Sequence, residues 1–476
     1  MVASADIKKL YGISILSLLL AAFIAYRFPS YFILILPPIF LLAGLFILSI
    51  ESVFFIVAFC SPFSIKYLIG GSGINLPDEP LMIVLMFLFI IKMIEEPSLF
   101  KPILKQPLTL LVTLNLGWIL ITSVTSTLPM VSFKFLFARL WTVTFGYFWG
   151  VLIFKNPKNI KKFILAFGLG LCVVVIYSTY NHYGFGFSQK KAMLVMKPLM
   201  DDHTVYSAVC SMVLAFCVTM LFLKNLFYEK LLFFGIALLS LTGVILSYSR
   251  AAALSLVFVL IFSFLLKLKI RFKTLSICFL VIISVGLVFS NEIYQRIRLN
   301  HVASGKNLIG DIKSISNVNN DESNVERLNR WESGFRMFKE KPFLGFGPGT
   351  YQFQYSGYQK SNQMTSISTT HGDMGNAHSE YFGPLIESGV IGFLIVLMLF
   401  GLSISILMKL YYQHDDRTIR MFSLAILLSL LTYYFHGMMN DFLDQDKAAV
   451  LVWALLGMAT SLNLKRVSNG SLKKEW

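Results

Sequence analysis

The fold is decided by stretches such as residues 391–408, IGFLIVLMLFGLSISILM, which contain no charged side chain. An α-helix of this length rises ~27 Å and can cross a hydrocarbon core that is about 30 Å thick. Similar runs recur along the chain, because apolar residues make up 56% of its 476 positions and charged residues only 14%. A soluble globular chain carries nearer a quarter charged residues, so the composition indicates a polytopic membrane protein.

The expected fold is an all-α polytopic membrane protein with about 12–14 transmembrane helices and one large loop that contains short helices. The first apolar run has no small-residue cleavage site after it, which favours a retained helix over a signal peptide. The predicted spans are 10–26, 31–49, 52–68, 80–94, 108–126, 133–154, 160–181, 203–223, 230–247, 250–267, 273–290, 384–411, 418–437 and 447–464.

Lysine and arginine side chains gather in every second connection between the predicted spans. By the positive-inside rule these connections and both termini are expected in the cytoplasm, and the alternate connections face outward. The net charge of +16 therefore indicates contact with anionic lipid headgroups rather than with nucleic acid. The clusters are Lys8 and Lys9; Lys101 and Lys105; Lys155, Lys158, Lys161 and Lys162; Lys224 and Lys230; Lys267, Lys269, Arg271 and Lys273; Arg417 and Arg420; and Lys465, Arg466, Lys473 and Lys474.

Three parts are predicted: an N-terminal bundle over 1–290, a large outward-facing polar loop over 291–383, and C-terminal helices with a cytoplasmic tail over 384–476. A loop this long between spans usually carries function. Its segment 304–326 is polar and aperiodic and is expected to be an irregular surface excursion. The segment 327–341 carries apolar residues at spacings of three and four, which predicts an amphipathic helix along the outer membrane face.

The sequence predicts neither a metal site nor a nucleotide site. The five cysteines all lie in apolar segments, and the loop residues His371, Asp373, His378 and Glu380 match no familiar set of metal ligands. Glycines at every second position over 345–349 lack the lysine and hydroxyl residues of a phosphate-binding loop. They predict a tight backbone corner instead.

Arginines on the outward side are candidates for binding an anion. Arg250 ends the run 247–250, in which two serines supply further donors, and it suits a phosphate ligand, although arginines near span ends commonly snorkel to the interface. Arg327 lies four residues before Trp331, so the two share one helix face and Arg327 could reach an anionic substrate or headgroup. For Arg330 a solvated helix face is the commoner role, and substrate binding is the alternative.

His378 lies in the run Asn376-Ala377-His378-Ser379-Glu380-Tyr381, which is predicted to form a short helix over 376–382 before the next span. Histidine titrates near neutrality, so it could act as a general base or as a phosphate ligand, whereas an exposed loop histidine is the simpler interpretation. His203 opens an outward-ending span and could face the same cavity. Further polar residues at the outer ends of the last two spans could line its entrance: His436, Asn440, Asp441, Asp444 and Asp446.

In this order, these parts resemble the O-antigen ligase and polymerase superfamily. The resemblance covers about 247–395 and is carried by the following segments: Ser249-Arg250-Ala251, Arg327 with Trp331, KPFLGFGPGTY at 341–351, NAHSEY at 376–381, and Glu387-Ser388-Gly389 with Gly392. It implies a GT-C-like enzyme of the bacterial inner membrane that moves a glycan from undecaprenyl diphosphate to a sugar hydroxyl on the periplasmic face. The implied transfer is independent of metal and inverts the anomeric centre.

The resemblance also implies roles for particular residues. Arg250 and Arg327 would hold the diphosphate, and His378 would lie near it or activate the acceptor. Arg139 is matched, less closely, to a further family arginine, and Ser379 stands where the family has asparagine. Substrate contacts are expected from Arg139, Arg330, His203, Asn376 and Tyr381.

Several acceptors and one other class of protein stay open. The leading assignment is an O-antigen ligase with lipid A–core as the acceptor. A polysaccharide polymerase and a protein O-oligosaccharyltransferase are alternatives within the same superfamily. A lipid-linked oligosaccharide transporter would also need outward arginines, but it would carry charges at mid-membrane, and few are present in these spans.

Overall fold

The computed structural model describes residues 49–69, 72–224, 226–268, 274, 322–361, 364, 368 and 375–468. Within these residues, nine helices are long and apolar enough to cross a membrane. They are α6 (Pro107–Val124), the continuous helix Pro129–Ile153, α9 (Lys158–Gly184), α10 (His203–Leu221), α11 (Phe227–Leu246), α12 (Arg250–Lys267), α19 (Gly389–Gln413), α20 (Arg417–His436) and α21 (Asp446–Ser468). The helix Pro129–Ile153 consists of α7 (Pro129–Val143), a π-helical segment η3 (Thr144–Trp149) and α8 (Gly150–Ile153).

These helices confirm an all-α polytopic membrane protein, and they match the nine predicted spans within 108–267 and 384–464 to within a few residues. The predicted span 384–411 is broken at its start, because α18 (Phe382–Glu387) ends before Gly389, which has a φ of +69°. The predicted spans 10–26, 31–49 and 273–290 lie outside the described residues except for Ser49 and Thr274.

Two further predicted spans have a different outcome. The span 80–94 is helical as part of α4 (Asp78–Glu95), but α4 is not among the nine spanning helices, and it is followed by the short helix α5 (Pro97–Leu104). The span 52–68 is wrong in its second half. Helix α3 (Ile50–Cys60) passes into a 3₁₀ turn η2 (Ser61–Phe63), where Pro62 lacks the N–H that would continue a helix.

A β-hairpin that the sequence analysis did not predict follows this turn. Strand β1 (Ile65–Ile69) pairs antiparallel with β2 (Ser72–Leu76), with Ile65 opposite Leu76. Isoleucine and tyrosine in β1 favour an extended strand, and the run is too short and too interrupted to hold a membrane helix.

Two helices form the centre of the bundle. In both α10 and α21, 89% of the residues in an 18-residue apolar stretch of the helix are buried, whereas this share is 28% in α12 and 33% in α6 and α11. Helix α10 packs against α11 and α20, and α21 packs against η3. The outer helices keep leucine, isoleucine and phenylalanine on their exposed sides, as lipid-facing helices do.

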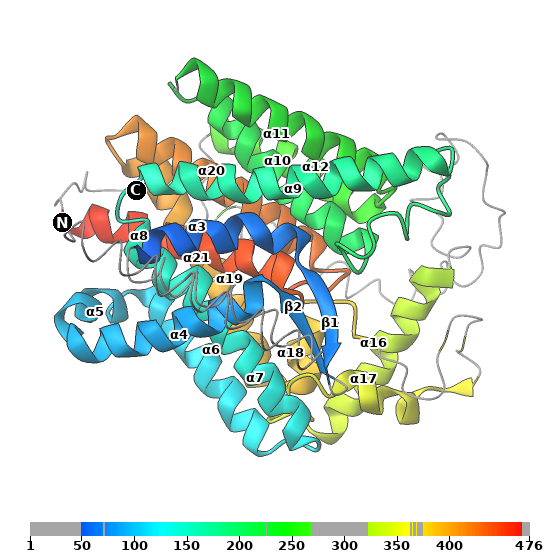
Figure 1. Ribbon diagram of the computed structural model, residues 1–476. Coiled ribbons are helices and arrows are strands. Elements are labelled where there is room, and N and C mark those ends of the chain that lie inside the picture. Colours follow the sequence, from blue (N-terminus) through cyan, green and yellow to red (C-terminus); the bar gives the residue numbers. More distant parts are fainter. Residues whose placement is uncertain are drawn as a thin grey trace, which may run out of the picture.

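The polar elements gather at one end of the bundle, where β1, β2, α16 (Glu322–Glu340), α17 (Tyr351–Gln354) and α18 lie together, while the C-terminal end of α21 lies at the opposite end (Figure 1). A 3₁₀ turn, η4 (Tyr355–Tyr358), follows α17. The predicted amphipathic helix 327–341 is confirmed as part of α16. The predicted irregular segment 304–326 is wrong for 322–326, which begin α16, and its remainder lies outside the described residues.

The loop elements share a small apolar core of their own, and its largest members are Tyr351 and Tyr355. The glycine corner is confirmed, because Gly345, Gly347 and Gly349 all have positive φ. The predicted helix over 376–382 is wrong: residues 376–379 are irregular, a turn follows, and α18 begins only at Phe382. His378 itself has a φ of +48°, which a helix does not allow.

Candidate functional site: a basic cluster beside an acidic cavity

Arg330 on α16 ties this helix to the irregular segment that follows it in space. Its Nε donates to Glu326 Oε1 at 2.9 Å, and its Nη1 donates to the carbonyl oxygen of Asn376 at 3.3 Å and to Nε2 of His378 at 2.9 Å. The side chain is only 8% exposed, so the solvated helix face expected for Arg330 is wrong. A charged group buried in this way is held by several partners at once.

The contact with Arg330 determines the protonation of His378. A guanidinium group has no acceptor, so Nε2 of His378 must accept, and its ring proton lies on Nδ1. Burial, together with the positive charges of Arg330 and Arg327, lowers the pKa of His378 to about 3. The imidazole is therefore neutral at physiological pH.

Arg327 lies one helical turn before Arg330 on α16, and the charges of Arg250, Asp202 and Arg330 act on it. Its half-buried guanidinium has a lowered pKa because of burial and because of the positive charges of Arg250 and Arg330, which Asp202 partly offsets. Arg250 is the first residue of α12, whose N-cap Ser249 accepts from the N–H of Ala252 at 3.4 Å. The starts of α10 and α12 thus approach α16, and Arg250, Arg327 and Arg330 form what we call the basic cluster.

His203 reaches the basic cluster through its neighbour. Its Nδ1 lies 2.7 Å from Asp202 Oδ1, and the negative charge of Asp202 raises the pKa values of both Arg327 and His378. The carboxylate of Asp202 therefore offsets part of the repulsion that Arg250 and Arg330 exert on Arg327.

Two aromatic side chains hold α16 in place beside this segment. Trp331 Nε1 donates to the carbonyl oxygen of Ala377 at 2.9 Å, and Tyr351 OH donates to that of Arg330 at 2.8 Å. Tyr381, a predicted substrate contact, lies elsewhere: its hydroxyl donates to the carbonyl oxygen of Tyr434 at 2.9 Å, inside the helix bundle.

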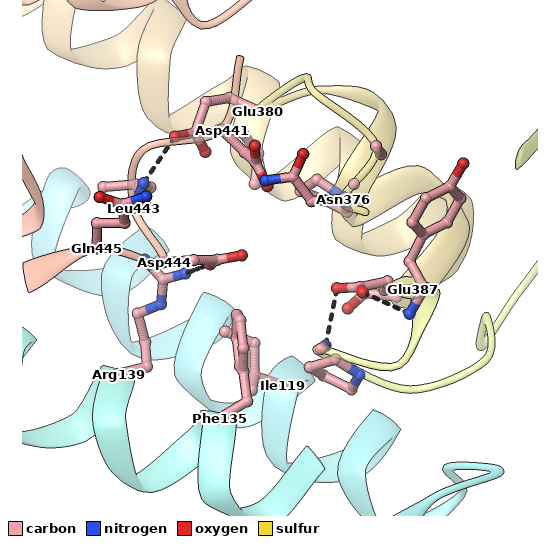
Figure 2. Close-up of a pocket in the computed structure, with 18 of the residues that line it drawn as sticks. Ile119, Phe135, Arg139, Asn376, Glu380, Glu387, Asp441, Leu443, Asp444 and Gln445 are labelled. Atoms are coloured by element: carbon pink, nitrogen blue, oxygen red, sulfur yellow. Dashed lines mark hydrogen bonds and ion pairs between the residues drawn. The ribbon is translucent and has the colours of Figure 1, made fainter. Parts of the chain in front are cut away.

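A cavity of about 480 Å³ lies on the other side of the segment 376–380 (Figure 2). Its walls come from α6 and α7, from the glycine corner, from α18 and α19, and from the connection between α20 and α21. Its charged lining is mainly acidic, with Asp201, Glu380, Glu387, Asp441, Asp444 and Asp446 against Lys66, Arg139 and Lys447. Arg139, a predicted substrate contact, therefore lies in this acidic cavity, where its Nη2 donates to Asp444 Oδ1 at 3.0 Å.

Two carboxyl groups, of which Glu380 is buried and Glu387 half-buried, fix the walls of the cavity. Glu380 Oε1 accepts from the backbone N–H groups of Phe442 at 2.5 Å and Leu443 at 2.8 Å, and burial together with nearby Asp444 raises the pKa of Glu380 to about 7. Glu387 accepts from the N–H of Gly349 in the glycine corner at 2.9 Å and from the N–H of Tyr351, the first residue of α17, at 3.0 Å. The loops around the cavity are thus held by hydrogen bonds to these two side chains.

Sequence reasoning missed several of these groups. Glu326 was assigned to an irregular excursion, although its place four residues before Arg330 would have indicated an ion pair on one helix. Glu387 and Tyr351 appeared only as parts of motifs. Within the part of the chain that the structure describes, no group of three or more His, Cys, Asp or Glu side chains is placed to hold a metal ion. His371 and Asp373 lie outside that part.

Comparison with known proteins gives two findings. Residues 235–397 match the family model described as O-antigen ligase, and this range contains the basic cluster, His378 and Glu387 but not Arg139 or Asp444. An uncharacterized protein from Haemophilus influenzae is 24% identical over 312 residues, which cover 64% of this chain and 74% of that protein.

Proposed function

We propose that this protein is a glycosyltransferase of the bacterial inner membrane. The match of residues 235–397 to the O-antigen ligase model supports its place in the O-antigen ligase and polymerase superfamily. The proposed enzyme takes a glycan from undecaprenyl diphosphate and passes it to a sugar hydroxyl on the periplasmic face. We further propose that residues 1–290 form a membrane bundle, that residues 291–383 form a periplasmic loop with most of the site, and that residues 384–476 form C-terminal helices. Both termini would lie in the cytoplasm.

The observation that carries the proposal is that Arg330 and Arg327 both act on one neutral histidine, His378, while Arg250 acts on Arg327. The positive charges of Arg250 and Arg330 each lower the pKa of Arg327, so both repel its guanidinium group. An anion with two phosphates would relieve that repulsion and could accept bidentate hydrogen bonds. The cluster lies at the bundle end that holds α16 to α18, where the diphosphate of a membrane-embedded lipid would reach it.

His378 fits a contact to the diphosphate better than a general base. Its Nε2 already accepts from Arg330, and a pKa of about 3 makes it a weak base. Its Nδ1–H can donate to a phosphate oxygen without adding another positive charge to the cluster. This assignment leaves removal of the acceptor proton to another group or to water.

The transfer then follows from charge stabilisation. The bond between the anomeric carbon and the diphosphate oxygen breaks as the acceptor oxygen attacks from the opposite side, which inverts the anomeric centre. The acceptor oxygen loses its proton as the new bond forms, and the leaving diphosphate carries the bonding electrons as negative charge. Guanidinium groups fixed in a partly desolvated site stabilise this charge most in the transition state, so no metal is needed.

The test uses the native host after deletion of the gene, complemented with the wild type, Arg327→Ala, His378→Ala or Lys339→Ala. Lys339 is exposed on the same helix and serves as the matched control. We expect glycans to stay on undecaprenyl diphosphate after deletion and in the first two variants, while Lys339→Ala restores transfer.

The size of the stranded glycan identifies the acceptor step. Long polymers indicate a ligase, with lipid A–core as our leading acceptor, or a protein-modifying transferase, and glycan attached to purified protein separates these two. Single repeat units indicate a polymerase. Full activity of Arg327→Ala at normal membrane levels would refute the diphosphate site.

A further inference from the structure

The acidic cavity and the basic cluster share one thin wall. On one side, the carbonyl oxygen of Asn376 accepts from Arg330, and on the other side Asn376 lines the cavity. Tyr351 has the same double position, because it lines the cavity and its hydroxyl donates to the backbone of Arg330. The segment that contains Asn376 would therefore lie between a ligand in the cavity and a diphosphate held by the cluster.

Some residues that line the cavity hold buried polar atoms that the described part of the chain does not satisfy. Arg139 is 8% exposed and Trp453 is 2% exposed, and among the described residues neither Arg139 Nη1 nor Trp453 Nε1 has a hydrogen-bond partner. The same holds for the acceptor Gln445 Oε1. All three residues line the cavity. Buried polar atoms without a partner are rare, so they indicate a polar ligand or bound water.

The remaining lining suits a sugar. Phe135, Trp118 and Tyr351 bring aromatic rings to the cavity, and Asp444, whose side chain is 47% exposed, offers oxygen atoms beside Arg139. Figure 2 shows Phe135 and Arg139 on one wall with Asp444 beside Arg139, and Asp441 and Glu380 across from them. Carboxylates accept from sugar hydroxyls, buried N–H groups donate to them, and a ring face covers the C–H groups of a pyranose. The volume lies within the ~300–1,000 Å³ typical of small-molecule sites.

The charge of the cavity selects among sugars. Six carboxyl groups line it against three cationic side chains, one of which, Arg139, is already paired with Asp444. Burial and the nearby charge of Asp444 raise the pKa of Glu380 to about 7 and that of Glu387 to about 8, so the cavity already disfavours negative charge. A sugar with a carboxylate or phosphate would add a further negative charge to this poorly solvated space, which disfavours its binding. A neutral sugar or an amino sugar avoids this added negative charge. The ammonium group of an amino sugar would also be attracted to the carboxylates.

We infer that this cavity is the acceptor site, and that it takes an acceptor terminus of about two sugars that are neutral or amino-substituted rather than acidic or phosphorylated. The inference rests on the proposed function and goes beyond it by naming the chemistry of the acceptor and the groups that select it. Asp441 and Asp444 set the selectivity, and Arg139 with Trp453 orients the sugar hydroxyls.

The test measures binding of three disaccharides to the full-length protein in lipid nanodiscs by saturation-transfer NMR. The probes are maltose, which is neutral, the diamino disaccharide of glucosamine, and digalacturonate, which is anionic. Binding of undecaprenyl diphosphate is measured separately by native mass spectrometry. We expect signals from the first two sugars and none from digalacturonate.

Two variants and a matched control locate the binding. Val396→Trp on α19 fills the cavity and should abolish the sugar signals, whereas Met398→Trp on the same helix, where the native side chain is 48% exposed, should leave them intact. Asp444→Asn removes the counter-ion of Arg139 and should admit digalacturonate.

The outcomes separate this inference from the proposed function. Equal signals from all three sugars, no signal from any of them, or signals that persist in Val396→Trp would overturn the acceptor site, even where undecaprenyl diphosphate still binds. Failure of the wild type to bind undecaprenyl diphosphate would overturn the proposed function on which it rests.

Discussion

Arg330 Nη1 donates to Nε2 of His378 across 2.9 Å, and this one contact joins helix α16 to an irregular segment 48 residues further along the chain. Together with burial it keeps the imidazole neutral. It also places the ring proton on Nδ1 and holds His378 in a conformation with φ at +48° that an isolated peptide seldom adopts. A residue held in a rare conformation by a buried charged partner is a feature expected of a functional site.

Replacing Arg330 with lysine should abolish transfer although the charge is kept. Lysine cannot donate at once to Glu326, Asn376 and His378, because its ammonium group lacks the planar fork of guanidinium. We expect a loss of at least about 100-fold, which corresponds to roughly 3 kcal/mol of transition-state stabilisation. The measurement is the initial rate with purified donor, and Arg336→Lys on the same helix is the control. Retention of most activity would show that charge alone suffices.

His378 should make the protein less stable in mild acid. The pKa of His378 is about 3 in the folded protein, whereas its ordinary value, which applies to the unfolded chain, is 6.5. Between these two pH values the unfolded chain therefore binds more protons than the folded protein. Stability from this group is complete above about pH 6.5 and falls as the pH drops toward 3. Between about pH 7.5 and about pH 5, the wild type should lose on the order of 1–2 kcal/mol more than His378→Gln. Thermal melts of both proteins in detergent measure this difference, and parallel melting curves would contradict it.

Glu380 should act mainly as a hydrogen-bond acceptor for the connection between α20 and α21. Glu380→Ala leaves the N–H groups of Phe442 and Leu443 without their acceptor, at about 1–3 kcal/mol each. Glu380→Gln keeps the accepting oxygen and should remain close to the wild type in stability. Limited proteolysis of the connection reports the loosening, and equal cleavage of both variants would contradict this role.

The start of α19 depends on a glycine. Gly389 has a φ of +69°, and a Cβ placed there would lie 2.0 Å from the carbonyl oxygen of Phe343. Gly389→Ala should therefore destabilise the protein by more than about 2 kcal/mol, since it combines an unfavourable φ with a backbone clash. Gly383→Ala is the matched control, because nothing described lies within 4 Å of its added Cβ. Detergent melting temperatures decide, and similar values for the two variants would refute the argument.

The sequence by itself determined three features. Long apolar runs determined the spanning helices, apolar periodicity determined the amphipathic helix, and the spacing of the glycines determined the glycine corner. Each of these depends on interactions local to its own segment: a long apolar run must satisfy its backbone within a helix in lipid, and Gly345 needs no distant partner to turn the chain. The motifs also singled out Arg327 and His378, and in the structure the charge of Arg327 acts on His378.

Only the tertiary structure decided how these groups meet. It buried Arg330, which the sequence placed on a solvated face, and it moved Arg139 away from the basic cluster into an acidic cavity. It also turned part of a predicted span into strand β1. These outcomes depend on partners far apart in the chain, such as Asp444, which lies 305 residues from Arg139. A periodic pattern carries no information about such contacts, because they are fixed by how the helices pack.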